Sequence, residues 1–313
     1  MKSTFNTGSL TGSYFNENYI WAIGMQLAWN DLCENVINAK VDISTKNSAG
    51  RALFEQFNKR KFTNKALSEN DYFVKSGFGQ ETVDQIREKL QEKFQARTTD
   101  SLSAISLLPS ELICFSYLAK NFRHKVDFEE IEMTFKSTPV KGFTIPNDQN
   151  SGAKIIDYDD DDNFVIGLAS RDELDEIYLI KGNDGASMDE ILHFLRGATV
   201  SRGYPIHKLD VLQIPNVKID YHRDYKELIG AELINRKIKP LFIAEMTEQI
   251  KLSMNYQGAV MENEAVILLT RGGRPIPKQL ILDKPFWLIM KETNKKQPYL
   301  ILRVENTTIL ETI

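Results

Sequence analysis

Residues 284–306 read KPFWLIMKETNKKQPYLILRVEN, and this stretch decides the predicted fold. Its apolar runs FWLIMKE (286–292) and YLILRVEN (299–306) have the length and composition of β-strands. The polar connection ETNKKQ separates them, and short connections of this kind join antiparallel neighbours. The stretch therefore predicts a β-hairpin.

Strand-like runs continue upstream of this hairpin, where short apolar stretches alternate with polar, glycine or proline breaks. Such runs predict antiparallel sheets. They are EMTFKS (132–137), VKGFTI (140–145), KIIDYD (154–159), NFVIGLAS (163–170), DEIYLIKG (175–182), LDVLQIPNVKIDY (209–221), EQIKLSMNY (248–256) and QLILD (279–283). Residues 110–121 are too short and too evenly apolar for periodicity to separate helix from strand, and we expect a strand.

Helical periodicity dominates the first hundred residues. Apolar side chains at three- and four-residue steps predict helices over 18–38, 49–58 and 80–94. In the first of these the stripe is Trp21, Met25, Trp29, Leu32 and Val36, which we expect to lie in the core. Two short helices are predicted further on, one over 187–195 with Ser187 as its N-cap, the other over DYKELIGAEL (224–233).

The composition indicates one folded domain. A chain of 313 residues with 42% hydrophobic and 26% charged residues can bury a large core. We expect a single α+β domain over residues 1–313, mostly helical over 1–100 and mostly β-sheet over 101–313, with large antiparallel sheets on which the N-terminal helices pack.

Charge and apolar patterning exclude several classes of partner. The net charge of −4 gives no basic field for nucleic acid or for an anionic membrane, and no apolar run is long enough to cross a bilayer. The first 21 residues lack the apolar core of a signal peptide. We therefore expect a soluble cytoplasmic protein, although an export signal already removed would leave no trace. The two cysteines, Cys33 and Cys114, lie in apolar stretches and are expected to be free thiols.

No group of residues in the sequence indicates catalysis or a cofactor. The four histidines lack a second ligand at a metal-binding spacing, and no nucleophile elbow accompanies them: His124, His193, His207 and His222. The acidic cluster at 157–162 lacks the spacing of a calcium loop, and SGFGQ (76–80) lacks the glycines of a phosphate loop. The basic run at 235–239 is typical of a solvated loop.

From about Val211 onward, the order of segments resembles that of the serpins, the serine protease inhibitor superfamily. LQIPNVKIDY (212–221) is similar to the serpin strand with a proline before an alternating run, and DYKEL (224–228) to the helix that follows it. Residues 252–258 are similar to the strand that leads to the glycine of the reactive loop. The segments 284–290, 298–302 and 304–306 resemble the closing hairpin. A fainter likeness covers 115–135, and the first hundred residues do not match.

The resemblance implies that residues 258–281 form an exposed reactive-type loop. Its bait would be Arg271, Gly272 and Arg274, and its hinge would contain Gly258, Ala259, Met261 and Asn263. An inhibitory serpin traps a peptidase by inserting the cleaved loop into a sheet as a new strand.

Two hinge residues oppose such insertion. In a strand, Ala259, Met261 and Asn263 would share one face. Met261 is bulky, and burying the Asn263 amide without partners would cost about 1–3 kcal/mol.

Three functions therefore remain open. The first is a non-enzymatic, non-inhibitory protein that binds a partner or has a structural role. The second is an inhibitor of serine or cysteine peptidases that uses Arg271 or Arg274 as bait. The third is an enzyme whose site one sequence does not reveal. We expect no metal and no cofactor, and the partner would be a peptidase or another protein. The sequence does not indicate the oligomeric state.

Overall fold

The computed structural model describes residues 5–6, 17–94, 102, 105–145, 151–182, 188–236, 238, 241–256 and 277–313. The chain forms two compact units. Unit 1 comprises Met1–Trp21, Phe122–Asp220 and Lys251–Ile313, and unit 2 comprises Ala22–Asn121 and Tyr221–Ile250. That both units act as one domain stays a prediction.

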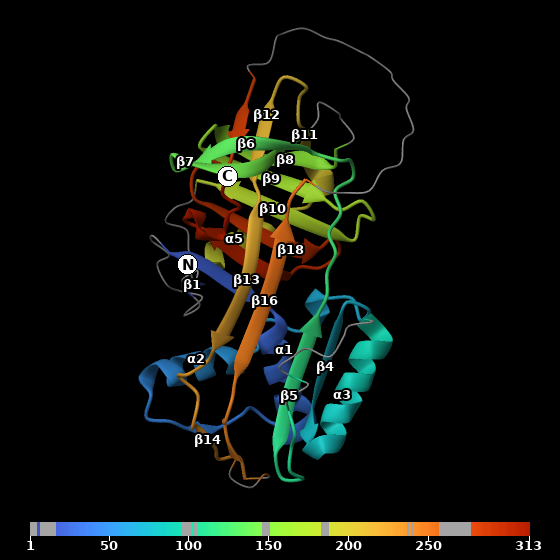
Figure 1. The fold of residues 1–313 in the computed structure, drawn as a ribbon, viewed down its shortest axis with the longest axis vertical. Helices are drawn as coiled ribbons and strands as arrows, with labels where there is room; N and C mark the ends of the chain where they lie inside the picture. Colours follow the sequence, from blue (N-terminus) through green and yellow to red (C-terminus); the bar gives the residue numbers. More distant parts are fainter. Residues whose placement is uncertain are drawn as a thin grey trace. The chain divides into compact units, whose positions relative to one another are not determined.

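Unit 1 contains an eight-stranded sheet, and Figure 1 labels six of its strands, β1, β8, β9, β10, β11 and β18. Its strands, in spatial order, are β1 (Phe5–Asn6), β2 (Asn18–Ala22), β19 (Pro298–Val304), β18 (Phe286–Glu292), β10 (Asp175–Lys181), β9 (Asn163–Ala169), β8 (Ala153–Asp160) and β11 (Tyr204–Pro205). The predicted C-terminal hairpin is confirmed, because β18 and β19 pair antiparallel from Phe286↔Val304 to Lys291↔Pro298. Every residue of these two strands is buried, which explains their continuous apolar runs.

A four-stranded sheet also lies in unit 1. Its spatial order is β17 (Gln279–Ile281), β12 (Val211–Pro215), β7 (Thr138–Thr144) and β6 (Glu129–Phe135). Lys136 and Ser137 join β6 to β7 with φ of 45° and 68°, the two positive values that a tight hairpin turn requires. Unit 1 further contains α5 (Met188–Leu195) and two short 3₁₀ turns, Val200–Arg202 and Thr307–Ile309.

Unit 2 carries the N-terminal helices. They are α1 (Gly24–Asp31), its π-helical continuation Leu32–Ile37, α2 (Ser48–Asn58), the 3₁₀ turn Asn64–Ala66 and α3 (Gly79–Phe94). Its strands are β3 (Ile43–Ser44), β4 (Tyr72–Phe78), β5 (Leu112–Leu118), β14 (Glu232–Leu233) and β15 (Leu241–Phe242). Figure 1 shows α3 alongside β4 and β5, and its predicted apolar stripe packs against them through Val83, Ile86 and Leu90.

Two further strands, β13 (Val217–Asp224) and β16 (Thr247–Met254), pair with each other and contribute residues to both units. The other strand predictions upstream of the hairpin are confirmed, and residues 112–118 form the strand expected within 110–121. The predicted helices α2, α3 and α5 are confirmed as well, although Ser187 lies outside the described residues.

The predicted helix over 18–38 is wrong in its first turns, because residues 18–22 form strand β2. The Asn18 side chain is fully buried and donates to Asn306 Oδ1 at 2.8 Å and to Thr308 Oγ1 at 2.9 Å. These bonds to residues almost three hundred positions away fix the strand, and helical spacing does not reveal them. Trp29 and Leu32 are buried in the core of unit 2, whereas Trp21 is only half-buried.

One further prediction is wrong. Residues 224–233 form turns and short strand ends rather than a helix. Leu228 N donates to Tyr225 O at 3.0 Å within a turn, whereas Tyr225 N donates to Met246 O and Gly230 N to Ile243 O, both at 2.8 Å. Residues 76–78, the first three of the SGFGQ segment, lie in strand β4. Gly79 begins α3 with φ of 71°, a conformation that glycine adopts without strain.

Candidate functional site

The predicted bait and hinge lie outside the described residues: Gly258, Ala259, Met261, Asn263, Arg271, Gly272 and Arg274. The structure does describe the two ends of that segment, which both belong to unit 1. We call residues 254–256, at the end of β16, the entry root, and residues 277–283 the exit root. The predicted loop range extended to about residue 281, but residues 279–281 form strand β17, so the exit root contains a strand.

His124 holds the entry root. Its Nε2 lies 2.9 Å from the Asn255 carbonyl oxygen, and Phe128 N donates to Tyr256 O at 3.4 Å. A carbonyl oxygen only accepts, so Nε2 carries the hydrogen and donates it. His124 is only 4% exposed, and burial lowers its pKa to about 4, which leaves the ring neutral at pH 7.

An aromatic cluster fixes the plane of the His124 ring. The ring stacks on Phe128 with centroids 4.1 Å apart, meets Phe122 edge-on at 5.6 Å and lies tilted 5.4 Å from Phe143. Phe128 and Phe143 also stack on each other at 5.5 Å. The donor nitrogen is therefore held in one direction, toward the end of β16.

Two carboxylates hold the exit root from outside it. Asp210 Oδ1 accepts a hydrogen bond from Lys278 N at 2.9 Å, and Asp161 Oδ1 accepts one from Gln279 N at 2.9 Å. Strand β17 also pairs in parallel with β12, with Leu280 opposite Leu212. Parallel pairing of so short a strand is reinforced by these two side-chain acceptors.

A buried lysine completes the exit root. Lys181 is 4% exposed, and its ammonium group donates to Ile281 O at 2.8 Å and to Asp161 O at 3.0 Å. It also forms ion pairs with Asp283 at 2.7 Å and with Asp162 at 3.0 Å. Within the acidic cluster at 157–162, Asp162 therefore pairs with Lys181, and Asp161 accepts a hydrogen bond from β17. Among the described residues, no three His, Cys, Asp or Glu side chains are arranged to hold a metal ion.

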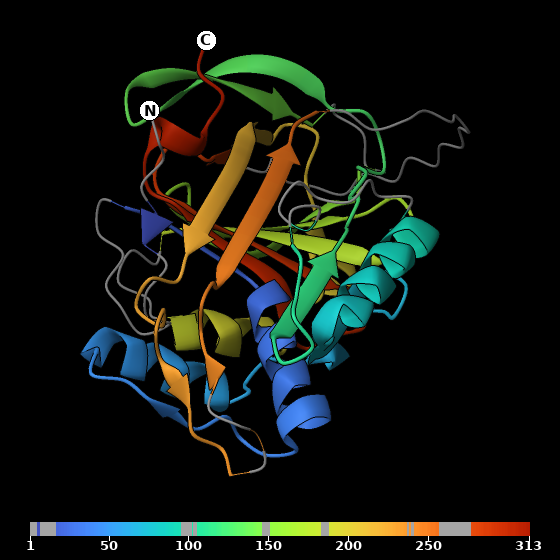
Figure 2. The same ribbon diagram turned by 60° about the horizontal axis from the view of Figure 1, so that its bottom comes forward.

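Within unit 2, the first residues of α1 contact two different strands, and Figure 2 shows this blue helix against the green β5. Ser116 Oγ of β5 donates to Gly24 O at 2.7 Å, and Met25 N donates to Glu248 Oε1 of β16 at 3.3 Å. In the described part of the chain, β5 pairs only with β4, and β16 pairs only with β13. One edge of each strand is therefore left without a described strand partner.

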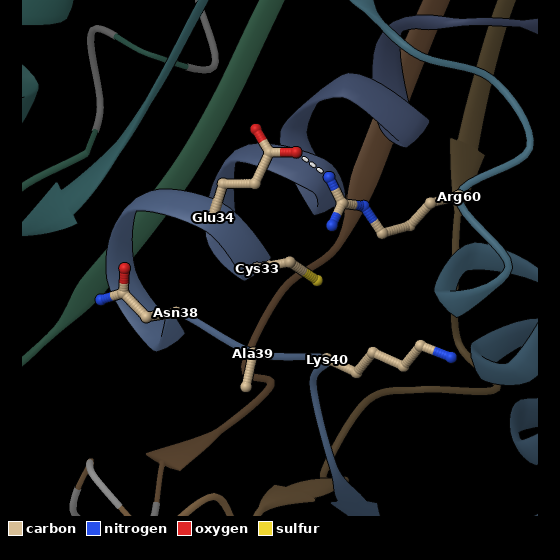
Figure 3. Close-up of a pocket in the computed structure, with 6 residues that line it drawn as sticks. All are labelled: Cys33, Glu34, Asn38, Ala39, Lys40 and Arg60. Atoms are coloured by element: carbon tan, nitrogen blue, oxygen red, sulfur yellow. Dashed lines mark ion pairs between the residues drawn. The ribbon is translucent and has the colours of Figure 1, made fainter.

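A pocket of about 320 Å³ lies on unit 2 (Figure 3). It is lined by Cys33, Glu34, Asn38, Ala39, Lys40 and Arg60. Glu34 and Arg60 form an ion pair across it, and burial raises the pKa of the Cys33 thiol. A thiol with a raised pKa is a poor nucleophile, and these six side chains include no general base paired with it.

The other residues that the sequence analysis considered, the cysteines and the remaining histidines, do not come together in a site. Both cysteines are free thiols, and burial raises the pKa of Cys114 to about 12. His222 lies 3.0 Å from Asp224 on the surface, and His207 Nδ1 accepts from Leu209 N at 3.2 Å. His193 stands in the last turn of α5. No two of the four histidines are brought to one site by the contacts described.

Comparison with known proteins rests on structure. No protein-family model matches the sequence, and none of the curated proteins is similar to it in sequence. Among solved structures, the mouse protein-Z dependent protease inhibitor matches with a TM-score of 0.54, covering 92% of this chain and 91% of that chain at 12% identity. This chain has a serpin-like fold.

Two further structures agree with the serpin-like fold. Arabidopsis AtSerpin1 in its native stressed conformation matches with a TM-score of 0.52 at 15% identity, covering 93% of this chain and 92% of that chain. Native protease nexin-1 with heparin matches with a TM-score of 0.51 at 12% identity over the same shares of the two chains. The resemblance inferred from the C-terminal third is thus confirmed for the fold, and the expected α+β class is confirmed with it.

One further finding concerns membranes. Among the described residues of this serpin-like chain, no helix is both long and apolar enough to span a bilayer.

The sequence did not reveal the residues that hold the two roots. His124 carries no motif, and its acceptor Asn255 lies 131 positions away. Asp161 and Asp162 were visible only as a cluster whose partners, residues 181, 279 and 284, are spread over the C-terminal half. A polar residue at or next to a strand end is the one local signal that Asp161, Asp162, Lys181 and Asp210 share, and His124 lacks it.

Proposed function

We propose that this chain is a non-enzymatic, serpin-like protein that binds a partner protein through the segment between its two roots, residues 257–276. The observation that carries the proposal is that both ends of this segment are fastened by buried polar groups of the same unit: His124 at the entry and Lys181 at the exit. Fixed ends lower the entropy that a binding segment loses when a partner orders it.

The composition of the segment suits a peptidase as the partner. Arg271 and Arg274 flank two glycines, and glycines favour a flexible, exposed turn. A peptidase with trypsin-like preference would cleave after Arg271, because Pro275 follows Arg274 and blocks cleavage there. The other protein partners left open by the sequence remain within this proposal.

The hinge residues support binding without inhibition. Insertion as a strand would place Met261 and Asn263 on one face with Ala259. A bulky side chain and an unpartnered amide on the buried face both slow insertion, which must be faster than hydrolysis of the peptidase intermediate. We therefore propose that a bound peptidase cleaves the segment and dissociates.

One observation favours the second candidate, a peptidase inhibitor. Strands β5 and β16 each have an edge without a described strand partner, and both contact the start of α1. An inserted strand needs two such edges to complete its backbone hydrogen bonds. The alternative function therefore depends on whether residues 259–263 can pair with these edges.

Incubation with a trypsin-like peptidase separates the two candidates. If the chain is non-inhibitory, denaturing electrophoresis shows two clean fragments and a fully active peptidase. A covalent complex that survives detergent supports inhibition and overturns the primary proposal. The Arg271→Gln variant is the matched control, since either outcome should then disappear or move to another bond.

A further inference from the structure

His124 is the one buried histidine among the described residues, and it lies at the point where the partner-binding segment begins. We propose that His124 is a positioning residue that sets how firmly the entry root is held, through its hydrogen bond to the Asn255 carbonyl. The inference rests on the proposed function only in assigning partner binding to residues 257–276. The bond itself is a property of unit 1.

Of the two described hydrogen bonds that residues 124–128 make to this root, the one from His124 is the shorter. The second bond, from Phe128 N to Tyr256 O, is 3.4 Å long and therefore weak. Phe128 is itself stacked on the His124 ring, so the position of this weaker donor also depends on His124. Removing the imidazole would loosen both of these hydrogen bonds.

The ring is oriented without help from charge. The flanking residues Lys125 and Asp127 direct their charges elsewhere: Lys125 pairs with Glu173 at 2.5 Å, and Asp127 lies 3.9 Å from Arg171. The main chain of His124 forms an isolated bridge with Ser170, which places the backbone. Burial and the Asn255 carbonyl are the influences on the pKa of His124, and no neighbouring charge contributes to its shift.

The neutral His124 ring therefore donates one hydrogen bond from Nε2 to the Asn255 carbonyl, and no other side chain of the aromatic cluster can donate a hydrogen bond in its place. Phe122, Phe128 and Phe143 fill space around it but have no donor. His124 therefore has two distinct roles. The aromatic plane fills the cluster, while the donor nitrogen holds the root.

The test compares His124→Phe with His124→Gln in the full chain. Phenylalanine keeps the aromatic packing and loses the donor, whereas the glutamine amide keeps a donor and loses the ring. His222→Phe is the matched control, because His222 is an exposed histidine. The probe is the rate at which trypsin at pH 8 cuts the native chain within 257–276.

We expect His124→Phe to be cut about three- to tenfold faster than the wild type, the loss of one net hydrogen bond. His124→Gln should lie closer to the wild type, and His222→Phe should equal it. Hydrogen exchange of the Phe128 amide should accelerate in the same order. Equal rates in all four proteins, or acceleration in His222→Phe as well, would overturn the proposal.

A measurement on the wild type needs no variant and remains informative if His124→Phe fails to fold. The ¹⁵N shifts of the buried imidazole at pH 7 should identify a neutral ring with its hydrogen on Nε2. A charged ring, or a hydrogen on Nδ1, overturns the proposal. Hydrogen exchange of the Phe128 amide and the ¹⁵N shifts of the imidazole involve no peptidase, so the proposed function can fail in the peptidase assay while these two readouts still test the inference.

Discussion

The Tyr225 hydroxyl donates a hydrogen bond of 2.8 Å to Glu248 Oε2 inside unit 2. The other carboxylate oxygen accepts from Met25 N at 3.3 Å, at the start of α1. Burial raises the pKa of Glu248, and the hydrogen bonds from Tyr225 and Met25 oppose that rise without cancelling it. Glu248, whose charged form is disfavoured by burial, thus lies on β16 and binds the start of α1.

We expect the stability of the fold to depend on pH through Glu248. The pKa of Glu248 is higher in the folded chain than the ordinary value of 4.5, so its contribution is fully present below pH 4.5 and is lost as the pH rises through the folded pKa. Glu248→Gln keeps an acceptor for Met25 N and a partner for Tyr225, but it carries no charge. The difference in unfolding free energy between variant and wild type should therefore grow with pH above 4.5. Urea denaturation at several pH values measures it, and a constant difference would refute the prediction.

Trp29 is predicted to be a major contributor to the core of unit 2. It is 4% exposed, stacks on Phe57 at 5.3 Å and donates through Nε1 to Asn58 Oδ1 at 3.1 Å. Trp29→Ala should lower the free energy of unfolding by about 3–5 kcal/mol. The half-buried Trp21 is the control, and Trp21→Ala should cost less. Equal losses in chemical denaturation would show that burial of Trp29 is not the cause.

We expect the titration of His124 to change the stability of the fold with pH in the opposite direction to that of Glu248. Its pKa falls from 6.5 in the unfolded chain to about 4 in the folded chain. Between these values the unfolded chain binds the extra proton, so stability is fully present above pH 6.5 and falls toward pH 4 by roughly 3 kcal/mol. His124→Phe should remove this acid limb. If the variant loses stability over that range as steeply as the wild type, the titrating group lies elsewhere.

The buried pair Lys291 and Glu176 gives a fourth prediction. Their charged groups lie 2.5 Å apart, with side chains 3% and 2% exposed, and Glu176 also accepts from Tyr178 and from Val200 N. Lys291→Met leaves the carboxylate buried without its cation and should cost about 3–5 kcal/mol. The double variant Lys291→Met with Glu176→Gln should recover part of that loss. Thermal and urea unfolding compare the three proteins, and a double variant no more stable than the single one would contradict the ion-pair explanation.

Local signals in the sequence were sufficient for much of the fold. The hairpin of β18 and β19 follows from two apolar runs and the polar turn between them, and α3 follows from the spacing of Val83, Ile86 and Leu90. These elements depend on neighbours close in sequence. The sequence predicts them because each local choice agrees with the global fold.

The misses share a cause, which is hydrogen bonding across long sequence separations. Residues 18–22 have helical spacing, yet the bonds of Asn18 to residues 305–308 make them a strand. Residues 224–233 have helix-forming side chains, yet two of their backbone donors, Tyr225 N and Gly230 N, bond to residues 246 and 243, and the segment contains no helix. The same holds for the site, since neither His124 with Asn255 nor Lys181 with Ile281 is visible as a motif.

The central claim is that the segment between the two roots binds a partner without entering a sheet. The most direct measurement is the melting temperature of the chain before and after a single cut following Arg271. Strand insertion would release stored strain and raise the melting temperature strongly. We predict no rise, because Met261 and Asn263 oppose insertion. A large rise after the cut would contradict the claim and identify the chain as an insertion-competent peptidase inhibitor.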